Sequence, residues 1–305
     1  MKYQVHRDFK HLQYFHMTKN LQLLKVENFV VSVLYHAMKT PKDIIHQRIN
    51  VTSRDGGIIK IDVYRPKTSN NVLPVLMYYP GGGFIMSASH FHKKNLMNMV
   101  RLTHSVGIIV HYRLAPKYPF PTAFYDAIDA WDYVVNHASE LQIDPKRLAL
   151  CGDSAGGNLA CGIALYNQDH LKKDVSALFL VYPGLDKGQN SYTRKHYIDV
   201  PMFNASMFPL IEKVFYKNGT GDLEKYAFPL FHGKPYELPP VYLETAEFDC
   251  LLDDGLQFHQ LLKENGIEVT LNQTKGTVHG YDIVQTSSIV KESFNQRIAF
   301  LKRYL

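Results

Sequence analysis

Hydrophobic residues in the first forty positions of the chain recur at roughly helical spacing. Leu21, Leu24, Phe29, Val33 and Ala37 follow this spacing, and Pro41 ends it. The pattern predicts that the N-terminal region is helical. Beyond Pro41 the pattern becomes that of β-strands, with two strand-like stretches on either side of the turn signal Asp55-Gly56-Gly57.

From there to the C-terminus, strand-like and helical stretches alternate. The predicted strands cover residues 44–53, 58–64, 73–79, 106–111, 147–151, 177–182, 241–246 and 267–273, and the predicted helices cover 122–138, 155–166, 253–265 and 286–303. Such alternation is typical of the α/β class, with a mostly parallel central sheet covered by helices on both faces. We expect residues 1–305 to form a single domain.

One stretch, residues 184–221, interrupts this alternation. It spans about forty residues without a predicted strand, longer than an ordinary connection in a compact domain. It is rich in aromatic residues, namely Tyr192, Tyr197, Phe203, Phe208, Phe215 and Tyr216. Two interpretations stay open: a lid or binding element over a site, or an extra surface helix packed on its own aromatic side chains.

Composition excludes several classes of protein. Of the 305 residues 46% are hydrophobic and 20% are charged, which excludes a disordered or collagen-like chain. The net charge is +6, but it is not gathered into a run of like charges or a recognised binding module, so we expect no role in nucleic-acid binding. The three cysteines, Cys151, Cys161 and Cys250, form no C-x-x-C pair and predict neither a disulfide framework nor a zinc site.

The ends of the chain and its apolar runs bear on location. Residues 1–20 are polar and lack the apolar core of a secretory signal. No apolar run approaches the roughly 20 residues that span a bilayer, so we expect no membrane span. Together with the free cysteines, this predicts a soluble, cytoplasmic protein.

The strongest chemical motif is Gly152-Asp153-Ser154-Ala155-Gly156, which matches G-x-S-x-G. It lies between a predicted strand and a predicted helix, the context of the nucleophile elbow of α/β-hydrolases. A sharp turn there exposes the hydroxyl of Ser154, and crowding at the turn requires the two small flanking residues. Ala155 opens the helix, so its N–H is free to bind an oxyanion. A helix-entry turn that binds phosphate is the simpler alternative.

A second motif, Pro80-Gly81-Gly82-Gly83-Phe84, follows the predicted strand 73–79. Three adjacent glycines are entropically costly, so this position requires bare backbone. In a hydrolase such a loop supplies N–H groups to the oxyanion. A flexible turn or a phosphate cradle are the alternatives, and the latter is disfavoured because no G-K-[ST] follows.

Order along the chain selects the partners of Ser154, because in α/β-hydrolases the acid and then the histidine follow the serine. Asp249 comes just after the predicted strand 241–246, whereas Asp253 and Asp254 are better explained as capping and first-turn charges of the next helix. Among the 15 histidines, two lie beyond Asp249. His259 falls on the predicted helix surface, and His279 lies in a loop after the predicted strand 267–273. We therefore predict Asp249 as the acid and His279 as the base.

At this point the chain resembles the hormone-sensitive-lipase-like carboxylesterases, a branch of the α/β-hydrolases. Residues 152–159 match the family's G-D-S-A-G-G-N-L, residues 112–121 match Y-R-L-A-P-E-x-P-F-P with Lys117 in place of Glu, and residues 249–253 resemble D-P-L-x-D. The resemblance implies a catalytic triad of Ser154, Asp249 and His279, which agrees with the positional prediction. It also implies oxyanion donors at Gly81, Gly82, Gly83 and Ala155.

The resemblance further implies an α/β-hydrolase fold with a helical cap, built from elements within residues 1–40 and 184–221. One departure stands out, because the family's H-G-G-G motif begins with His where this chain has Pro80. A histidine there can steady the loop by hydrogen bonding, whereas proline has no N–H to donate. The glycine donors are kept, so we expect activity with an altered oxyanion geometry.

These observations predict a serine carboxylesterase that needs no cofactor or metal and acts on a small-molecule ester. An amidase, deacetylase or peptidase with the same triad is the alternative, since fold does not settle the substrate. A binding protein that has lost its chemistry is disfavoured because all three triad residues are present. We expect short-to-medium acyl esters, because no exposed apolar stripe for an oil surface is evident, and we consider a homodimer.

Overall fold

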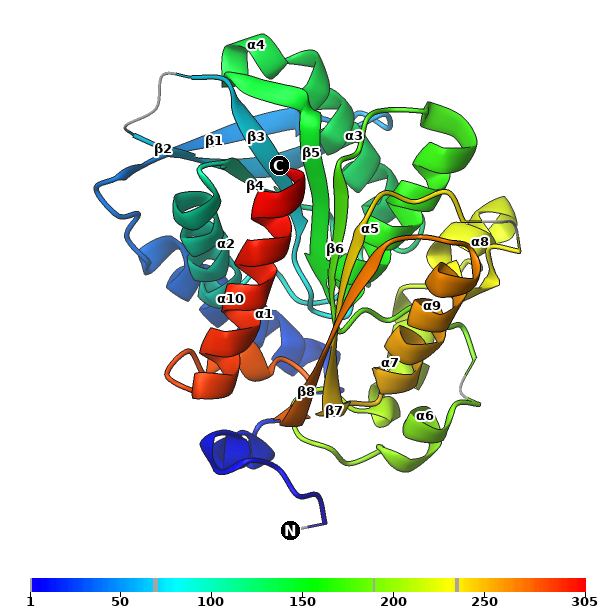
Figure 1. The fold of residues 1–305 in the computed structure, drawn as a ribbon. Helices are drawn as coiled ribbons and strands as arrows, with labels where there is room; N and C mark the ends of the chain where they lie inside the picture. Colours follow the sequence, from blue (N-terminus) through cyan, green and yellow to red (C-terminus); the bar gives the residue numbers. More distant parts are fainter. Residues whose placement is uncertain (1, 68–70, 189, 234–235) are drawn as a thin grey trace.

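The computed structural model describes residues 2–67, 71–188, 190–233 and 236–305. In this part of the chain eight strands form one sheet, in the order β1-β2-β4-β3-β5-β6-β7-β8 (Figure 1). β3 to β8 are parallel, whereas β2 pairs antiparallel with both β1 and β4. The strands are β1 (Ile44–Thr52), β2 (Ile58–Pro66), β3 (Leu73–Tyr79), β4 (Val106–His111), β5 (Ile143–Asp153), β6 (Ala177–Val181), β7 (Val241–Phe248) and β8 (Val269–Val278). The predicted mostly parallel sheet is confirmed.

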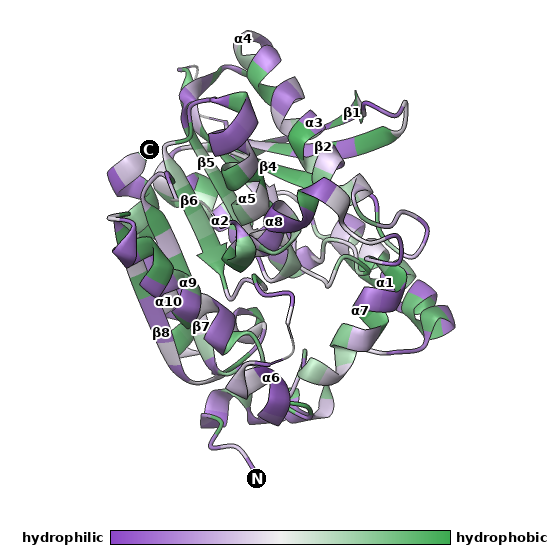
Figure 2. Cartoon of the chain, turned by 90° about the vertical axis from the view of Figure 1, so that its right-hand side faces the viewer, coloured by the Kyte–Doolittle hydropathy of each residue, from purple (hydrophilic) through white to green (hydrophobic). Residues whose placement is uncertain are grey.

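Helices cover both faces of this sheet, as predicted. α2 (His90–Thr103) and α10 (Ser288–Tyr304) pack on one face, and α3 (Thr122–Asn136), α5 (Ala155–Tyr166) and α9 (Leu252–Glu264) pack on the other (Figure 1). Because the central strands are covered on both sides, they are hydrophobic along most of their length (Figure 2).

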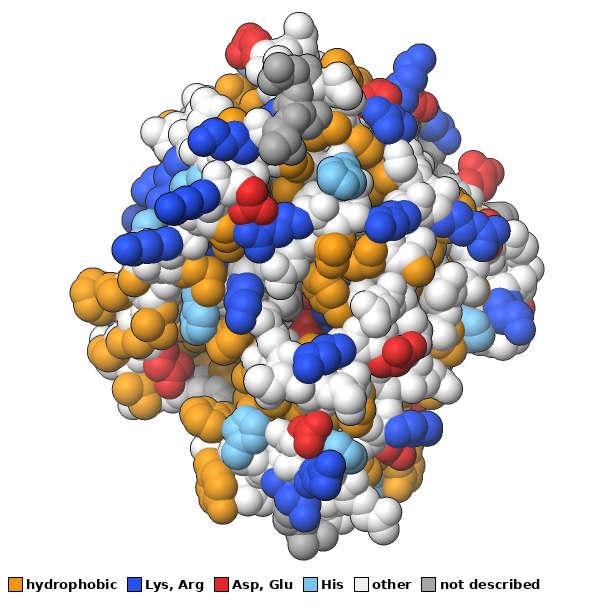
Figure 3. Space-filling model, turned by 60° about the vertical axis from the view of Figure 1, so that its left-hand side comes forward, with side chains coloured by type: hydrophobic (Ala, Val, Ile, Leu, Met, Phe, Trp, Pro, Cys, Tyr) orange, Lys and Arg blue, Asp and Glu red, His pale blue; other side chains and the backbone are white. Residues whose placement is uncertain are grey.

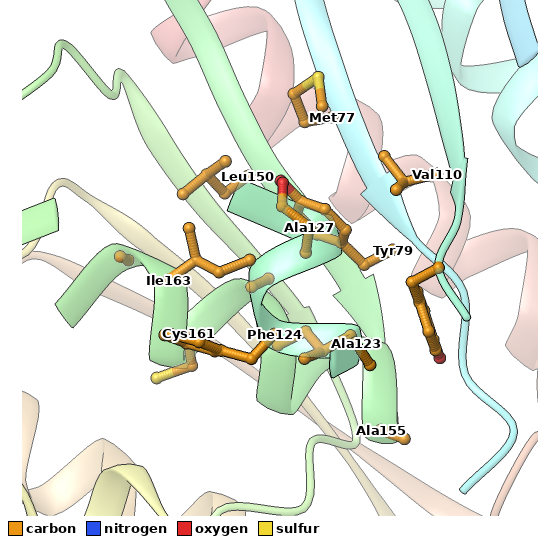
Figure 4. Packing of buried hydrophobic residues seen from close by; sticks show 14 of the residues in the cluster. Met77, Tyr79, Val110, Ala123, Phe124, Ala127, Leu150, Ala155, Cys161 and Ile163 are labelled. Atoms are coloured by element: carbon orange, nitrogen blue, oxygen red, sulfur yellow. The ribbon is translucent and has the colours of Figure 1, made fainter. Parts of the chain in front are cut away.

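The core beneath α3 and α5 illustrates this packing. Phe124 and Ala127 of α3 and Ile163 of α5 lie against Met77 of β3 and Leu150 of β5 (Figure 4). All five side chains are almost fully removed from water. This packing fixes the carboxyl end of β5 and the start of α5, where the G-x-S-x-G motif lies.

The N-terminal region is not continuously helical, so that prediction was wrong in part. A 3₁₀ helix (Arg7–Tyr14) and α1 (Leu21–Ala37) are separated by residues 15–20. Asn20 starts α1 anew, since its side chain accepts the free N–H groups of the first turn. The segment before it is extended because the N–H of Met202 donates to Phe15 O at 2.7 Å and the N–H of Met17 donates to Met202 O at 3.1 Å.

α1 also overturns the expectation that no apolar stripe is exposed. Leu24 and Tyr35 are its buried residues, whereas six hydrophobic side chains have exposed fractions between 47% and 69%. We call these six residues, Leu23, Val26, Phe29, Val30, Val33 and Leu34, the apolar face of α1. Phe29 and Val33, which set the helical pattern in the sequence, belong to it.

Two further elements differ from the sequence-based expectation. α2 was not predicted, because His90, His92 and two lysines interrupt its apolar spacing. β8 runs to Val278 rather than ending near residue 273, since its pairing with β7 shifts register and resumes at Phe248. His279 therefore follows the strand directly instead of lying within a longer loop.

Residues 184–221, which we call the cap segment, contain short helices, α6 (Tyr192–His196) and α7 (Phe208–Val214). They lie with α1 at the carboxyl ends of the strands (Figure 1). The shorter helices are α4 (Ala138–Leu141), α8 (Glu224–Ala227), a π-helix (Asn167–Leu171) and 3₁₀ turns at Ala205–Met207, Gly221–Leu223, Pro229–Phe231 and Tyr281–Ile283. Among the described residues, no helix is both long enough and apolar enough to cross a bilayer.

Candidate active site

Ser154 lies on the sharp turn between β5 and α5. Its backbone adopts φ 53° and ψ −120°, a strained conformation for a residue other than glycine. A side chain at Gly152 would bring a Cβ to 2.2 Å from Gly156 O, and one at Gly156 would reach 1.8 Å from Tyr79 O. Both flanking positions therefore require glycine, as the motif indicated.

The three predicted triad residues lie in a chain of hydrogen bonds. His279 Nε2 lies 2.9 Å from Ser154 Oγ, and His279 Nδ1 lies 2.7 Å from Asp249 Oδ2. Since the carboxylate accepts from Nδ1–H, the Nε2 atom is left to accept the serine proton. The residues follow β5, β7 and β8, so three parallel strands bring them to the same edge of the sheet.

Burial and aromatic contacts hold the imidazole in place. The Asp249 side chain is fully buried and also accepts the N–H of Leu251 at 2.9 Å. The ring of His279 packs between those of Tyr182 and Phe203, with centroids 4.7 and 5.1 Å away. The imidazole is therefore oriented before any substrate binds.

The other two carboxylates weighed for the acid lie elsewhere. Asp253 and Asp254 are in the first turn of α9, as expected, but the cap of that helix has no side-chain hydrogen bond. Asp254 is fully buried, pairs with Arg194 at 2.5 Å and accepts the N–H groups of Leu185 and Asp186. Its task is to anchor the cap segment, which corrects the interpretation as a helix-capping charge. His259 lies in the middle of α9 and is only partly buried.

The glycine loop, residues 80–84, lies beside the serine. Gly82 and Gly83 have φ of +128° and +60°, conformations that glycine adopts without strain. A Cβ at Gly82 would lie 2.7 Å from Met86 O, so the loop has no room for side chains there. Ala155 opens α5, where first-turn N–H groups have no partner within the helix.

Gly81 differs from the other predicted oxyanion donors. Its N–H donates to Asp153 Oδ1 at 3.0 Å, so it is already engaged. This corrects the expectation for Gly81, which has a structural task instead. The set of candidate donors reduces to the N–H groups of Gly82, Gly83 and Ala155.

Asp153, the residue before the serine, is the centre of a buried network that the sequence analysis missed. Besides Gly81, its Oδ1 accepts from the Tyr78 hydroxyl at 2.7 Å, and its Oδ2 lies 3.2 Å from His92 Nε2. His92 Nδ1 accepts the N–H of Ser89 at 2.9 Å, which leaves the proton on Nε2 to be donated to Asp153. Burial opposes protonation of His92, but the neighbouring Asp153 carboxylate outweighs it and raises the pKa.

This network explains how the loop is held without the family's histidine. The Pro80 carbonyl accepts from the Tyr112 hydroxyl at 2.5 Å, and Gly81 is tied to Asp153. The sequence signal for His92 was its spacing from Ser89, a capping-box arrangement at the start of α2.

Two cavities meet at Ser154. The smaller, about 220 Å³, extends under the cap segment and is lined by aromatic side chains that include Phe203, Phe208 and Tyr216. The larger, about 530 Å³, extends under α1 and is lined by Val26, Val30 and Val31 among others. Cap and N-terminal elements thus form the walls of the site. Within residues 2–67, 71–188, 190–233 and 236–305, no group of three or more His, Cys, Asp or Glu is placed to hold a metal ion.

Comparisons with known proteins place this chain in a family. Residues 76–283 match the family model described as alpha/beta hydrolase fold. Carboxylesterase NlhH of Mycobacterium tuberculosis is 31% identical over 88% of this chain and 86% of its own length, and ethyl acetate hydrolase of Pseudomonas putida is 30% identical over 80% and 77%.

The solved structures agree with these relatives. A bacterial heroin esterase superposes with a TM-score of 0.88 at 26% identity, over 99% of this chain and 98% of that chain. Fold, matched region and relatives therefore lead to one assignment. The chain belongs to the α/β-hydrolase fold family, in its hormone-sensitive-lipase-like branch, and is a serine carboxylic ester hydrolase.

Proposed function

We propose that the chain hydrolyses carboxylic esters through Ser154, His279 and Asp249. Ser154 Oγ attacks the ester carbonyl while His279 Nε2 takes its proton, and Asp249 orients the imidazole and stabilises its charged form. The tetrahedral intermediate collapses, His279 gives the proton to the departing alcohol, and an acyl group remains on Ser154. Water, activated by the same histidine, then releases the acid. The unbroken hydrogen-bond chain from Asp249 to Ser154 is the observation that carries this proposal.

The N–H groups of Gly82, Gly83 and Ala155 would bind the oxyanion in this mechanism. Their support is that Gly83 and Ala155 line the smaller cavity, and Gly82 and Gly83 the larger one, each together with Ser154. Losing one such donor typically lowers the rate by about 10²–10³-fold, so their placement governs turnover.

The two cavities support short-to-medium acyl esters as substrates. The two halves of an ester diverge from its carbonyl, so one half can enter each cavity at Ser154. The smaller cavity, about 220 Å³ with aromatic walls, limits the half that it receives. Turnover of p-nitrophenyl esters from acetyl through butyryl and octanoyl to palmitoyl measures this, and fastest turnover on palmitoyl would overturn it.

The decisive experiment replaces the nucleophile. Ser154→Ala should lower p-nitrophenyl acetate hydrolysis by at least about 10³-fold while the fold survives, because binding and the oxyanion amides alone give little turnover. Ser139→Ala, on the exposed helix α4, is the matched control and should keep full activity. Undiminished turnover by the Ser154 variant refutes the assignment. A matched anilide, assayed beside the ester, separates an esterase from an amidase or peptidase.

A further inference from the structure

Among the residues that the structure describes, no element covers the apolar face of α1. Its six residues have exposed fractions of 47–69%, and the side chains form a hydrophobic group at the left edge of the molecule in Figure 3. Tyr14 and Phe15, just before α1, are exposed as well. An apolar group of this size is unusual on a soluble protein and marks an interaction surface.

This surface is continuous with the larger cavity. Phe15, Val26 and Val30 are both exposed and part of the cavity lining, so they form the rim of its mouth. The same cavity reaches Ser154 and His279. Whatever contacts the apolar face of α1 therefore also lies at the entrance to the site.

The charge around α1 is strongly one-sided. Residues 10–42 contain five lysines and one acidic residue, Glu27, and so supply +4 of the chain's net +6. All five lysines are exposed; they are Lys10, Lys19, Lys25, Lys39 and Lys42. An apolar face flanked by lysines is typical of helices that lie in the interface of an anionic bilayer.

We propose that α1 docks on an anionic lipid surface and places the mouth of the larger cavity against it. An apolar ester then passes from the lipid into the cavity and reaches Ser154 without crossing bulk water, a consequence that rests on the proposed esterase function. A second copy of the chain is the less suitable occupant. In a two-fold pair the same patch meets itself, so lysines would face lysines and the two cavity mouths would be closed.

Binding is measured with Ser154→Ala, so that no lipid is hydrolysed during the experiment. The full chain should sediment with vesicles of phosphatidylcholine containing phosphatidylglycerol, and bind phosphatidylcholine alone more weakly. Each lysine near an anionic surface contributes about a fivefold factor, so adding Lys19→Gln and Lys25→Gln should lower partitioning about 25-fold at low salt. Adding Phe29→Ser and Val33→Ser should lower it at least about tenfold in both kinds of vesicle.

Matched controls lie at the other end of the sheet. Val72→Ser removes an equally exposed apolar side chain before β3, and Lys146→Gln removes an exposed lysine at the start of β5. Both should bind vesicles like the parent. Equal losses in these controls would show a general surface effect and would overturn the proposal.

Turnover tests the delivery step. In the active chain, Phe29→Ser with Val33→Ser should leave hydrolysis of dissolved p-nitrophenyl acetate within about twofold, because neither residue lines the cavity. Hydrolysis of p-nitrophenyl octanoate carried in anionic vesicles should fall about tenfold, in proportion to the lost surface binding. Equal turnover of vesicle-borne ester by parent and variant would overturn the delivery step.

Two further outcomes would overturn docking itself. One is absence of vesicle binding by the parent. The other is a parent dimer, seen by light scattering, that Phe29→Ser with Val33→Ser converts to monomer, since the face would then be a contact between copies. If vesicles bind but no ester is cleaved, the proposed function fails and the docking surface stands.

Discussion

The link between His92 and Asp153 gives the sharpest prediction about turnover. His92→Leu removes the donor 3.2 Å from Asp153 Oδ2 and leaves a buried carboxylate with one partner fewer. Asp153 Oδ1 holds the Gly81 N–H at 3.0 Å, so a shift of this carboxylate moves the glycine loop. His92 acts here as a positioning residue: it holds Asp153, and Asp153 holds the loop whose Gly82 and Gly83 amides would bind the oxyanion.

The magnitude follows from the bond that is lost. A hydrogen bond to a charged group contributes about 1.5–3 kcal/mol. If the loop transmits most of this to the transition state, kcat falls about 10- to 100-fold. Full loss of one oxyanion donor would lower kcat by about 10²–10³-fold, so a donor that is only displaced should cause a smaller loss of kcat.

The assay is steady-state hydrolysis of p-nitrophenyl butyrate, with the concentration of active sites titrated. His92 also lines the larger cavity, so KM can change, but His92→Leu should lower kcat more than it changes KM, because the lost bond acts through the amides that would bind the oxyanion in the transition state. His92→Gln restores an N–H near the place of Nε2 and should recover much of the rate, which a merely structural gap would not do. His90→Leu, on the same helix, is the control. A kcat for His92→Leu within about twofold of the parent would refute the role.

Two buried ion pairs give the remaining predictions. Arg194→Met leaves the fully buried Asp254 without its cationic partner and should lower the free energy of unfolding, measured by urea titration, by about 3–5 kcal/mol. The exposed Lys195→Met is the control and should change it little, and equal effects of both variants would contradict the anchoring of the cap segment. Burial alone would raise the pKa of Asp62, but hydrogen bonds from His111, His46 and Arg48 hold it well below its usual value. The ionised Asp62 carboxylate therefore stabilises the fold above about pH 4, and this contribution is lost as the pH falls below that value. Asp62→Asn should lower the free energy of unfolding at neutral pH and flatten its decrease between about pH 5 and 3. Parallel plots of this free energy against pH for parent and variant would refute the reasoning.

Local patterns carried much of the fold and of the candidate site. The elbow around Ser154 was predictable because strand, two glycines and helix stand side by side in the chain. Asp249 and His279 were predictable from chain order, since each follows a strand of the same parallel sheet. The alternation of buried strands and helices gave the sheet and its two helical layers for the same reason.

What the sequence did not show are contacts between distant residues. His92 and Asp153 are 61 positions apart, and Arg194 and Asp254 are 60 apart, so no local spacing marks them as partners. The prediction for α1 was wrong for a different reason. It is hydrophobic on more than one side, and periodicity alone cannot tell which side meets the core and which meets water. In the sequence nothing distinguishes Gly81 from Gly82 and Gly83, and only the structure shows that its N–H donates to the Asp153 carboxylate.

The position of Asp153 has a consequence for how the site tolerates change. The carboxylate of Asp153, the residue before Ser154, also accepts a hydrogen bond from the N–H of Gly81, which precedes the amides that would bind the oxyanion. The residue before the attacking serine and the loop that carries the Gly82 and Gly83 amides are therefore joined by a direct hydrogen bond. The loop is held by this bond and by the bond from the Tyr112 hydroxyl to the Pro80 carbonyl, and neither needs a side-chain donor or an N–H at residue 80, which leaves that position free to be proline.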